Sequence, residues 1–231
     1  MTISRRAIFF LDSANWRDWE STAREGWLHG VTTNPTILQR AGLECSINTA
    51  IDLVRRAADI GLSEIQFQSW GREAAALADR GRALASLSPN VTVKVPATRD
   101  GVIAAQQIKA EGYRVTLTAC YTVRQCAVAR RLGFDYVAPY YGRMIEAGID
   151  ADRRLDAMRA VAGEEGPRIL IASLRQPEQV DALLARGFDT FTMAPEIARF
   201  VAVDPASEAA ADAFEEAAER SPTFLGTNFD I

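Results

Sequence analysis

The chain has 231 residues, of which 48% are hydrophobic and 24% are charged, and its formal net charge is −4 at pH 7. This length and composition are those of a compact globular protein with a substantial core. The negative net charge gives no general attraction to nucleic acid or anionic lipid, so we expect neither nucleic acid nor a membrane among its partners.

The N-terminal segment lacks the pattern of a signal peptide or a membrane span. Its apolar run at residues 7–11 is followed at once by Asp12, Ser13 and Asn15, and the run is too short for either role. The chain has three cysteines without CxxC spacing and one histidine, which indicates neither a disulfide framework nor a metal site. We therefore expect a cytoplasmic protein without a bound metal.

Short β-rich runs alternate with amphipathic segments of about 10 to 15 residues, which is the pattern of βα units around a parallel sheet. Apolar residues recur at intervals of three and four in the intervening segments, for example in residues 47–60, 72–87, 101–112 and 175–187. The expected strands are residues 7–12, 29–34, 64–69, 91–96, 113–118, 134–139, 168–173 and 188–193.

The number of these units selects the fold. Eight strand–helix pairs in a chain of this length predict a closed (β/α)8 TIM barrel. An open, doubly wound sheet usually has fewer strands and carries a GxGxxG turn after its first strand, and this chain has no such turn. We expect residues 1–231 to form one barrel domain.

The C-terminal segment, residues 205–231, continues beyond the eighth unit. Residues 205–220 are rich in alanine and predict an additional helix, whereas residues 221–231 read as a loose tail with aromatic residues. Exposed aromatic residues indicate packing on a neighbouring subunit or over the barrel mouth. A frayed terminus is the alternative.

Lys94 is the most informative single residue, because only Lys94 and Lys109 are lysines among the 26 basic residues. Lys94 interrupts the valines of VTVKVP, residues 91–96, and strand alternation turns its side chain into the barrel. A buried ammonium is costly without a partner. A desolvated lysine favours the neutral amine, which can attack a carbonyl carbon. A buried ion pair with Asp12 is the alternative.

Polar residues gather at the carboxyl ends of the expected strands, where the side chains of a barrel face its catalytic mouth. Branched apolar residues fill most barrel interiors, so packing does not account for this set. The sequence therefore predicts an active site at this end of the barrel. Its members are Asp12, Thr32, Asn34, Gln68, Lys94, Thr116, Thr118, Tyr140, Ser173 and Arg175.

Several motifs resemble, in order and spacing, the transaldolase family, and most closely its small fructose-6-phosphate aldolase branch. The similarity extends to about residue 220, and it implies Schiff-base carbon–carbon bond chemistry without a metal or organic cofactor. The motifs are LDSAN (11–15), GVTTNPTIL (30–38), VTVKVPAT (91–98), DYVAPYYGRM (135–144) and ILIASLRQPEQV (169–180).

The resemblance implies a role for each residue that handles the sugar donor. Lys94 matches the lysine that forms the imine, and Asp12 matches the carboxylate that takes the hydroxyl proton during cleavage. Thr32 and Asn34 match positions that hold donor hydroxyls and orient the lysine. Thr116 is expected to bind substrate beside them.

Two further groups follow from the same resemblance. Gln68, Thr118 and Tyr140 match the residues that hold the catalytic water in the aldolase branch. The phosphate-binding positions are matched by Arg143, Ser173 and Arg175.

The resemblance also bears on the reaction. Transaldolases usually have glutamate, serine and phenylalanine at positions 68, 138 and 140, whereas this chain has Gln68, Ala138 and Tyr140. We therefore expect a class I aldolase that joins or cleaves a dihydroxyacetone-type donor and an aldehyde such as a sugar phosphate. The alternatives are a transaldolase and, less favoured, a non-catalytic sugar-phosphate-binding barrel. Relatives in this branch form pentamers or decamers, so the resemblance implies a homo-oligomer.

Overall fold

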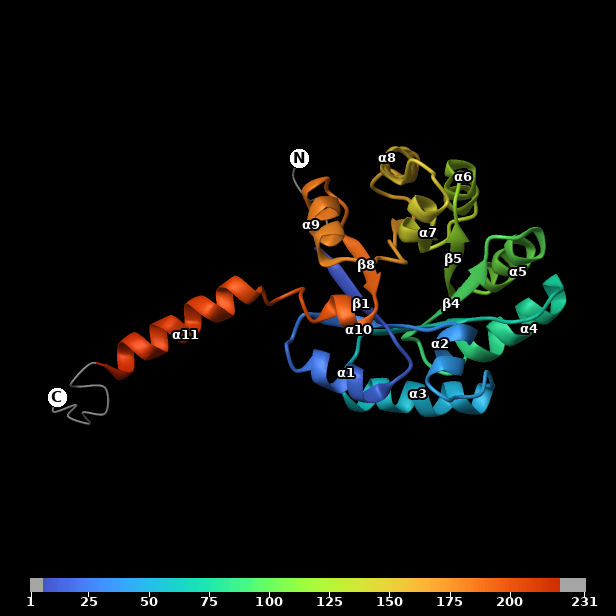
Figure 1. Cartoon of the computed structure of the whole chain (residues 1–231). Coiled ribbons are helices and arrows are strands. Elements are labelled where there is room, and N and C mark those ends of the chain that lie inside the picture. Colours follow the sequence, from blue (N-terminus) through green and yellow to red (C-terminus); the bar gives the residue numbers. More distant parts are fainter. Residues whose placement is uncertain (1–5, 221–231) are drawn as a thin grey trace.

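The computed structural model describes residues 6–220, which form a barrel of eight parallel strands surrounded by helices (Figure 1). The sheet order is β7-β6-β5-β4-β3-β2-β1-β8. Backbone hydrogen bonds of 2.9 Å join Ile171 to Thr190 and Thr192 and bring the two ends of the sheet together. The predicted TIM barrel is confirmed. The strands are β1 Ile8–Asp12, β2 Leu28–Thr32, β3 Glu64–Gln68, β4 Val91–Pro96, β5 Arg114–Cys120, β6 Tyr136–Pro139, β7 Arg168–Ile169 and β8 Thr190–Met193.

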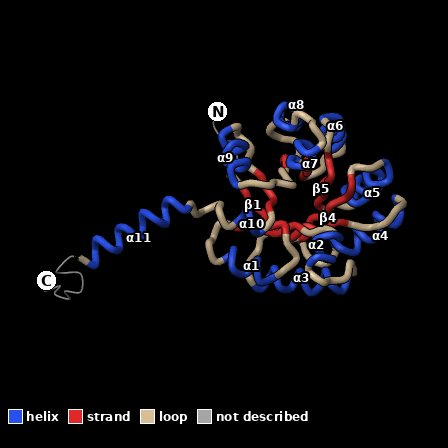
Figure 2. The backbone as a smooth tube through the Cα atoms, in the orientation of Figure 1, coloured by secondary structure: helices blue, strands red, loops and turns tan. Residues whose placement is uncertain are grey.

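The helices lie on the outer side of the strands, as the tube in Figure 2 shows. Their starts follow from local capping: Ser46, Thr98 and Thr122 each accept a backbone hydrogen bond through the side chain. The helices are α1 Trp16–Ala23, α2 Pro35–Arg40, α3 Ile47–Asp59, α4 Ala74–Ala85, α5 Arg99–Ala110, α6 Val123–Arg131, α7 Tyr141–Glu146, α8 Ala151–Ala162, α9 Pro177–Ala185, α10 Pro195–Ala198 and α11 Pro205–Glu219.

The hydrophobic core lies mainly between the sheet and the helices. On β4, the side chains of Val91, Val93 and Val95 are all buried in this layer. The same alternation turns Thr92 and Lys94 into the barrel. The interior contains a small apolar cluster of Phe10, Tyr136, Ala138 and Leu170, and most of its other lining is polar. The barrel interior is therefore available for hydrogen-bonding chemistry.

Every strand except β4 differs from its expected bounds by one or more residues, and the differences in β7 and β5 lie near the mouth. β7 ends at Ile169 rather than at residue 173, after which the chain makes only isolated bridges before Ser173 takes a positive φ of 66°. β5 continues to Cys120 through a register shift at Ala119, where φ is 57°. Irregular backbone of this kind re-aims side chains at functional sites.

The expected C-terminal helix is present as α11, which projects away from the barrel (Figure 1). No side chain of α11 is buried, and Phe214 is 72% exposed. Of the two places where this segment was expected to pack, α11 does not lie over the barrel mouth, and packing on a neighbouring subunit stays a prediction. The tail, residues 221–231, lies outside the described residues. Among the helices of residues 6–220, none combines the length and the apolar character that crossing a membrane requires.

Candidate active site

A pocket of about 380 Å³ opens at the carboxyl ends of the strands. It brings together side chains from β1, β3, β4, β5 and the loops after β2, β6 and β7, which are far apart in the sequence. Thr32 and Thr116 lie beneath it and are fully buried. Nine of the eleven predicted site residues line the pocket: Asp12, Asn34, Gln68, Lys94, Thr118, Tyr140, Arg143, Ser173 and Arg175.

Lys94 points into the barrel and is only 3% exposed. It lies between Gln68 of β3 and Thr116 of β5 in the strand register. Burial lowers the pKa of Lys94, and the opposing charge of Asp12 does not reverse this effect. Because no ion pair of Lys94 occurs within residues 6–220, unlike the pair of Lys109 with Asp135 at 2.7 Å, the environment favours a neutral, nucleophilic amine.

Asp12 is oriented by a short chain of hydroxyl groups. Thr32 Oγ1 donates a hydrogen bond of 2.6 Å to Asp12 Oδ1, and Thr192 Oγ1 lies 2.6 Å from Thr32 Oγ1. Since the proton of Thr32 is committed to the carboxylate, Thr192 must donate to Thr32. The Asp12 carboxylate is thus held at the pocket wall, where it can accept a proton from a bound hydroxyl group.

Asn34 combines a structural bond with a free polar group. Its Oδ1 accepts a hydrogen bond of 3.0 Å from the backbone N–H of Ile37 and caps the N-terminus of α2. The amide oxygen is therefore committed, and the NH2 group remains to donate toward the pocket that Asn34 lines. This arrangement suits a hydroxyl group of a substrate.

Two buried hydroxyl groups of the pocket lack hydrogen-bond partners within the described chain. They are Thr118 Oγ1 and Ser173 Oγ. A buried, unsatisfied polar group costs about 1–3 kcal/mol, so such groups mark places where a ligand or water completes the bonding. Ser173 also has the strained positive φ of 66°, and strain of this kind concentrates at functional sites.

Arginine side chains make the pocket attractive to anions. Arg143 lies over the ring of Tyr140, with its Cζ 5.1 Å from the ring centroid, and Arg175 Nε pairs with Glu146 at 2.9 Å. Arg40, at the end of α2, also lines the pocket. Asp12 supplies the carboxylate of the lining, whereas the arginines supply three positive charges. The excess of positive charge favours a phosphorylated substrate.

The sequence analysis did not identify Arg40. A signal was available, because Thr36 and Arg40 are four residues apart on α2 and share one helix face. Both line the pocket, as does Ile37. The weakness of the signal is that Arg40 lies a full helical turn beyond the TTNPT motif.

Gly142 explains how two parts of the anion-binding wall come together. A Cβ atom at this position would lie 2.1 Å from the carbonyl oxygen of Ser173, and the Gly142 N–H donates to the same oxygen at 3.0 Å. Only glycine permits this approach. It fixes the loop after β6, which carries Arg143, against the loop after β7, which carries Ser173 and Arg175.

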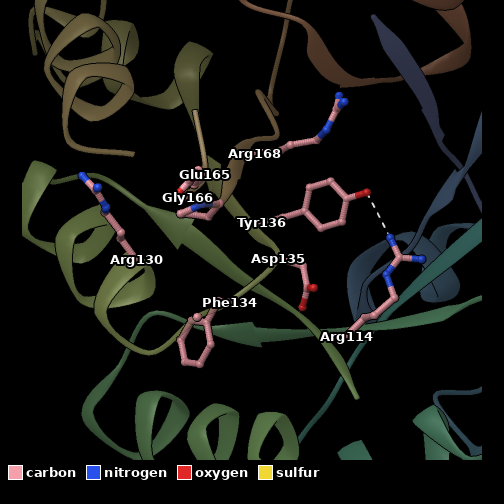
Figure 3. Close-up of a pocket in the computed structure, with 10 residues that line it drawn as sticks. Arg114, Arg130, Phe134, Asp135, Tyr136, Glu165, Gly166 and Arg168 are labelled. Atoms are coloured by element: carbon pink, nitrogen blue, oxygen red, sulfur yellow. Dashed lines mark hydrogen bonds between the residues drawn. The ribbon is translucent and has the colours of Figure 1, made fainter. Parts of the chain in front are cut away.

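A second pocket, of about 470 Å³, lies at the opposite end of the barrel (Figure 3). Its charged groups come from the starts of β5, β6 and β7 and from Arg130 of α6. Several are already paired: Arg114 with Glu64, Arg168 with Asp189 and Asp135 with Lys109. Barrel enzymes place their chemistry at the carboxyl ends of the strands. The candidate active site is therefore the pocket that contains Lys94.

Comparison with known proteins agrees with this assignment of chemistry. The profile of the Transaldolase/Fructose-6-phosphate aldolase family matches residues 9–230. A "Probable transaldolase" of Caulobacter sp. (strain K31) is 32% identical over 188 residues, which cover 80% of this chain and 84% of the relative. The "Probable transaldolase" of Caulobacter vibrioides is 31% identical over 190 residues, with 81% and 85% covered. That of Roseobacter denitrificans is 28% identical over 202 residues, with 87% and 91% covered.

Proposed function

The chain belongs to the transaldolase/fructose-6-phosphate aldolase family of lysine Schiff-base enzymes, and we propose that it transfers a dihydroxyacetone unit between sugar phosphates through Lys94. The observation that carries this proposal is the isolated, buried amine of Lys94 at the bottom of a cationic pocket. The names of the relatives favour transfer over simple cleavage.

The chemistry follows from a neutral Lys94. Its Nζ adds to the C2 ketone of the donor, and loss of water gives an iminium ion. Asp12 accepts the proton of the C4 hydroxyl group, the C3–C4 bond breaks, and the released electron pair moves to C3 and into the enamine, with the iminium nitrogen as electron sink. The first product leaves as an aldehyde.

Transfer reverses these steps with a second aldehyde. C3 of the enamine attacks the new carbonyl carbon, and Asp12 returns its proton to the alkoxide oxygen that forms. Water then hydrolyses the iminium ion and restores the free amine of Lys94. Thr32 supports both steps because its hydrogen bond holds Asp12 in one orientation.

An aldolase that releases free dihydroxyacetone is a second candidate, and the residues around the orphaned hydroxyl group of Thr118 favour it. Gln68, Thr118 and Tyr140 all line the pocket and together offer an amide and two hydroxyl groups to a water molecule. Such a water would protonate the enamine at C3 before a second aldehyde arrived. The fructose-6-phosphate aldolase branch is proposed on these residues alone.

The phosphate group is proposed to bind at the wall formed after β6 and β7. Arg143 and Arg175 supply guanidinium groups, and Ser173 supplies the unpartnered Oγ. Binding of a distant phosphate lets the protein fix the reacting carbons against Lys94 and Asp12. This role accounts for a buried hydroxyl group that is otherwise unsatisfied.

A homo-oligomer and a single catalytic domain are proposed as well. The exposed α11 carries Phe214 and a series of alanines away from the barrel, and burying these residues on a second copy would remove apolar surface from water. Light scattering of the full chain tests this proposal. A mass equal to the 25.3 kDa protomer would contradict it.

One experiment tests the proposed chemistry directly. Purified enzyme is incubated with fructose 6-phosphate and borohydride, and peptide mass spectrometry locates the reduced adduct, which we expect on Lys94. Lys94→Met serves as the control for modification elsewhere. A parallel assay with and without an acceptor aldehyde measures free dihydroxyacetone and separates cleavage from transfer. An unmodified Lys94 during turnover would refute the mechanism.

A further inference from the structure

A continuous set of hydrogen bonds crosses the barrel interior beneath the candidate active site. It starts at Glu64, whose side chain is fully shielded from solvent. Gln66 Nε2 donates to Glu64 Oε1 at 2.7 Å, and Thr116 Oγ1 donates to Gln66 Oε1 at 2.8 Å. None of these three residues is explained by apolar packing, and Glu64 and Gln66 do not line the pocket.

The lower end of this set is a carboxylate that can only accept hydrogen bonds. Arg114 lies 2.5 Å and Tyr136 Oη 3.0 Å from Glu64 Oε2, and His29 Nε2 lies 3.6 Å from the same oxygen. Burial alone would raise the pKa of Glu64, but His29 and the Arg114 guanidinium outweigh it and keep the pKa below its ordinary value. Figure 3 shows Arg114 directed at Tyr136 at this end of the barrel.

An ionised Glu64 fixes the direction of every bond above it. Because a carboxylate has no proton to donate, the Gln66 side chain must turn its NH2 group toward Glu64 and its carbonyl oxygen toward Thr116. Thr116 must then direct its only hydroxyl proton at Gln66. The remaining lone pairs of Thr116 Oγ1 can therefore accept hydrogen bonds but cannot donate one.

The direction of the Thr116 hydroxyl bond affects the Lys94 amine, because Thr116 is the β5 partner of Lys94. The bond between Gln66 of β3 and Thr116 of β5 crosses the inner face of β4, the strand between them. A hydroxyl group that donated to Lys94 Nζ would occupy the amine lone pair and suppress attack on a ketone. One that only accepts leaves this lone pair free for attack.

We propose that Gln66 and Glu64 are positioning residues for the Schiff-base reaction, because they hold Thr116 as an acceptor-only group beside Lys94. The inference rests on the proposed function of Lys94. Glu64, a buried carboxylate at the far end of the barrel, thus acts on the Lys94 amine through the side chains of Gln66 and Thr116.

The test compares Gln66→Met, which keeps the side-chain length and removes both hydrogen bonds, with the wild type. We expect kcat with a ketose phosphate donor to fall about tenfold while KM changes less than about twofold, because alignment and not substrate binding is lost. The rate of borohydride trapping at Lys94 should fall by the same factor. Thermal unfolding identifies any loss that comes from destabilisation alone.

The matched control is Thr190→Val, which alters an inward position of β8. Thr190 is buried, and its hydroxyl group is bonded to Arg168 and Asp189 and not to Glu64, Gln66 or Thr116, so we expect kcat to stay within about twofold of the wild type. A double variant, Gln66→Met with Thr116→Val, should be no slower than Thr116→Val alone, because both changes break one chain.

Gln66→Glu supplies a second test if Gln66→Met does not fold. Beside the ionised Glu64 the introduced carboxyl should be protonated at about pH 6, where it can donate to Glu64 and accept from Thr116. Its activity relative to the wild type should then decline toward about pH 9 as that proton is lost. A constant ratio, or a folded Gln66→Met enzyme with wild-type kcat, would overturn the inference. Failure to trap Lys94 in the wild type would instead overturn the proposed function.

Discussion

Thr32 lies beside Asp12 in the barrel interior and donates a hydrogen bond of 2.6 Å to its Oδ1 atom. The two residues come from neighbouring strands, where they are paired in the register of β1 and β2. The bond limits rotation of the carboxylate, and Thr192 in turn limits rotation of Thr32. Asp12 therefore enters the site with one defined orientation before a substrate binds.

Thr32→Val should lower kcat about tenfold, because Asp12 loses the donor that orients it for proton transfer. Steady-state kinetics with a ketose phosphate measures the change. Thr192→Val is the matched control and should have a smaller effect, since Thr192 contacts Asp12 only through Thr32. Equal losses in the two variants would show that the orientation of Asp12 is not the cause.

Lys94→Met should abolish activity and raise the free energy of unfolding by about 1 kcal/mol or more, because it removes a buried polar group that has no ion-pair partner among the described residues. Burial lowers the pKa of Lys94 in the folded state, whereas an unfolded lysine titrates near ~10.4. Between these values the unfolded chain binds more protons, so the stability of the wild type rises with pH.

The advantage of Lys94→Met should therefore be largest below the lowered pKa and shrink as the pH approaches about 10.4. Denaturant unfolding of both proteins across this range measures the difference. A pH-independent difference would contradict a depressed pKa. In the wild type, the rate of imine trapping should rise with pH as the neutral amine forms.

Tyr140→Phe should shift the enzyme toward transfer and away from release of free dihydroxyacetone, because one hydroxyl group that can hold the protonating water is removed. The ratio of the two products, measured at a fixed acceptor concentration, reports the shift. Tyr141→Phe is the neighbouring control, since the Tyr141 hydroxyl group donates to Asp152 at 3.0 Å instead of lining the pocket. An unchanged ratio in Tyr140→Phe would refute the role of Tyr140.

Arg40→Gln should raise KM for phosphorylated substrates about fivefold, which corresponds to ~1 kcal/mol for a charge-assisted contact, with little change in kcat. Unphosphorylated substrates should be unaffected. Arg24→Gln, which removes an exposed arginine paired with Glu20 on α1, is the control. The same increase in KM for charged and uncharged substrates would exclude an electrostatic role for Arg40.

Local patterns in the sequence were sufficient to predict the fold, because each strand and helix repeats its own apolar period. The valines on either side of Lys94 predicted a strand with its lysine turned inward, and the structure confirms this direction. Strand ends were less predictable. β7 stops at Ile169 because only isolated bridges continue the pairing as far as Ala172, before Ser173 takes a positive φ. No residue pattern predicts this irregular backbone.

The composition of the mouth could be read from the sequence because residues at the ends of parallel strands meet by topology. The sequence could not show which of these side chains donate hydrogen bonds to which others. Arg40 depends on which face of a short helix turns inward, and the link from Glu64 through Gln66 to Thr116 joins residues up to 52 positions apart (64 to 116). Such links exist only after the barrel closes.

The sequence by itself determined the eight-unit barrel, the inward position of Lys94 and the polar character of the mouth, because side-chain periodicity acts over a few residues. Only the tertiary structure decided which hydroxyl groups donate, which remain unpartnered and which charges are neutralised. Those properties depend on distances of about 3 Å between strands, and distances of this kind are set by the packing and register of the whole barrel.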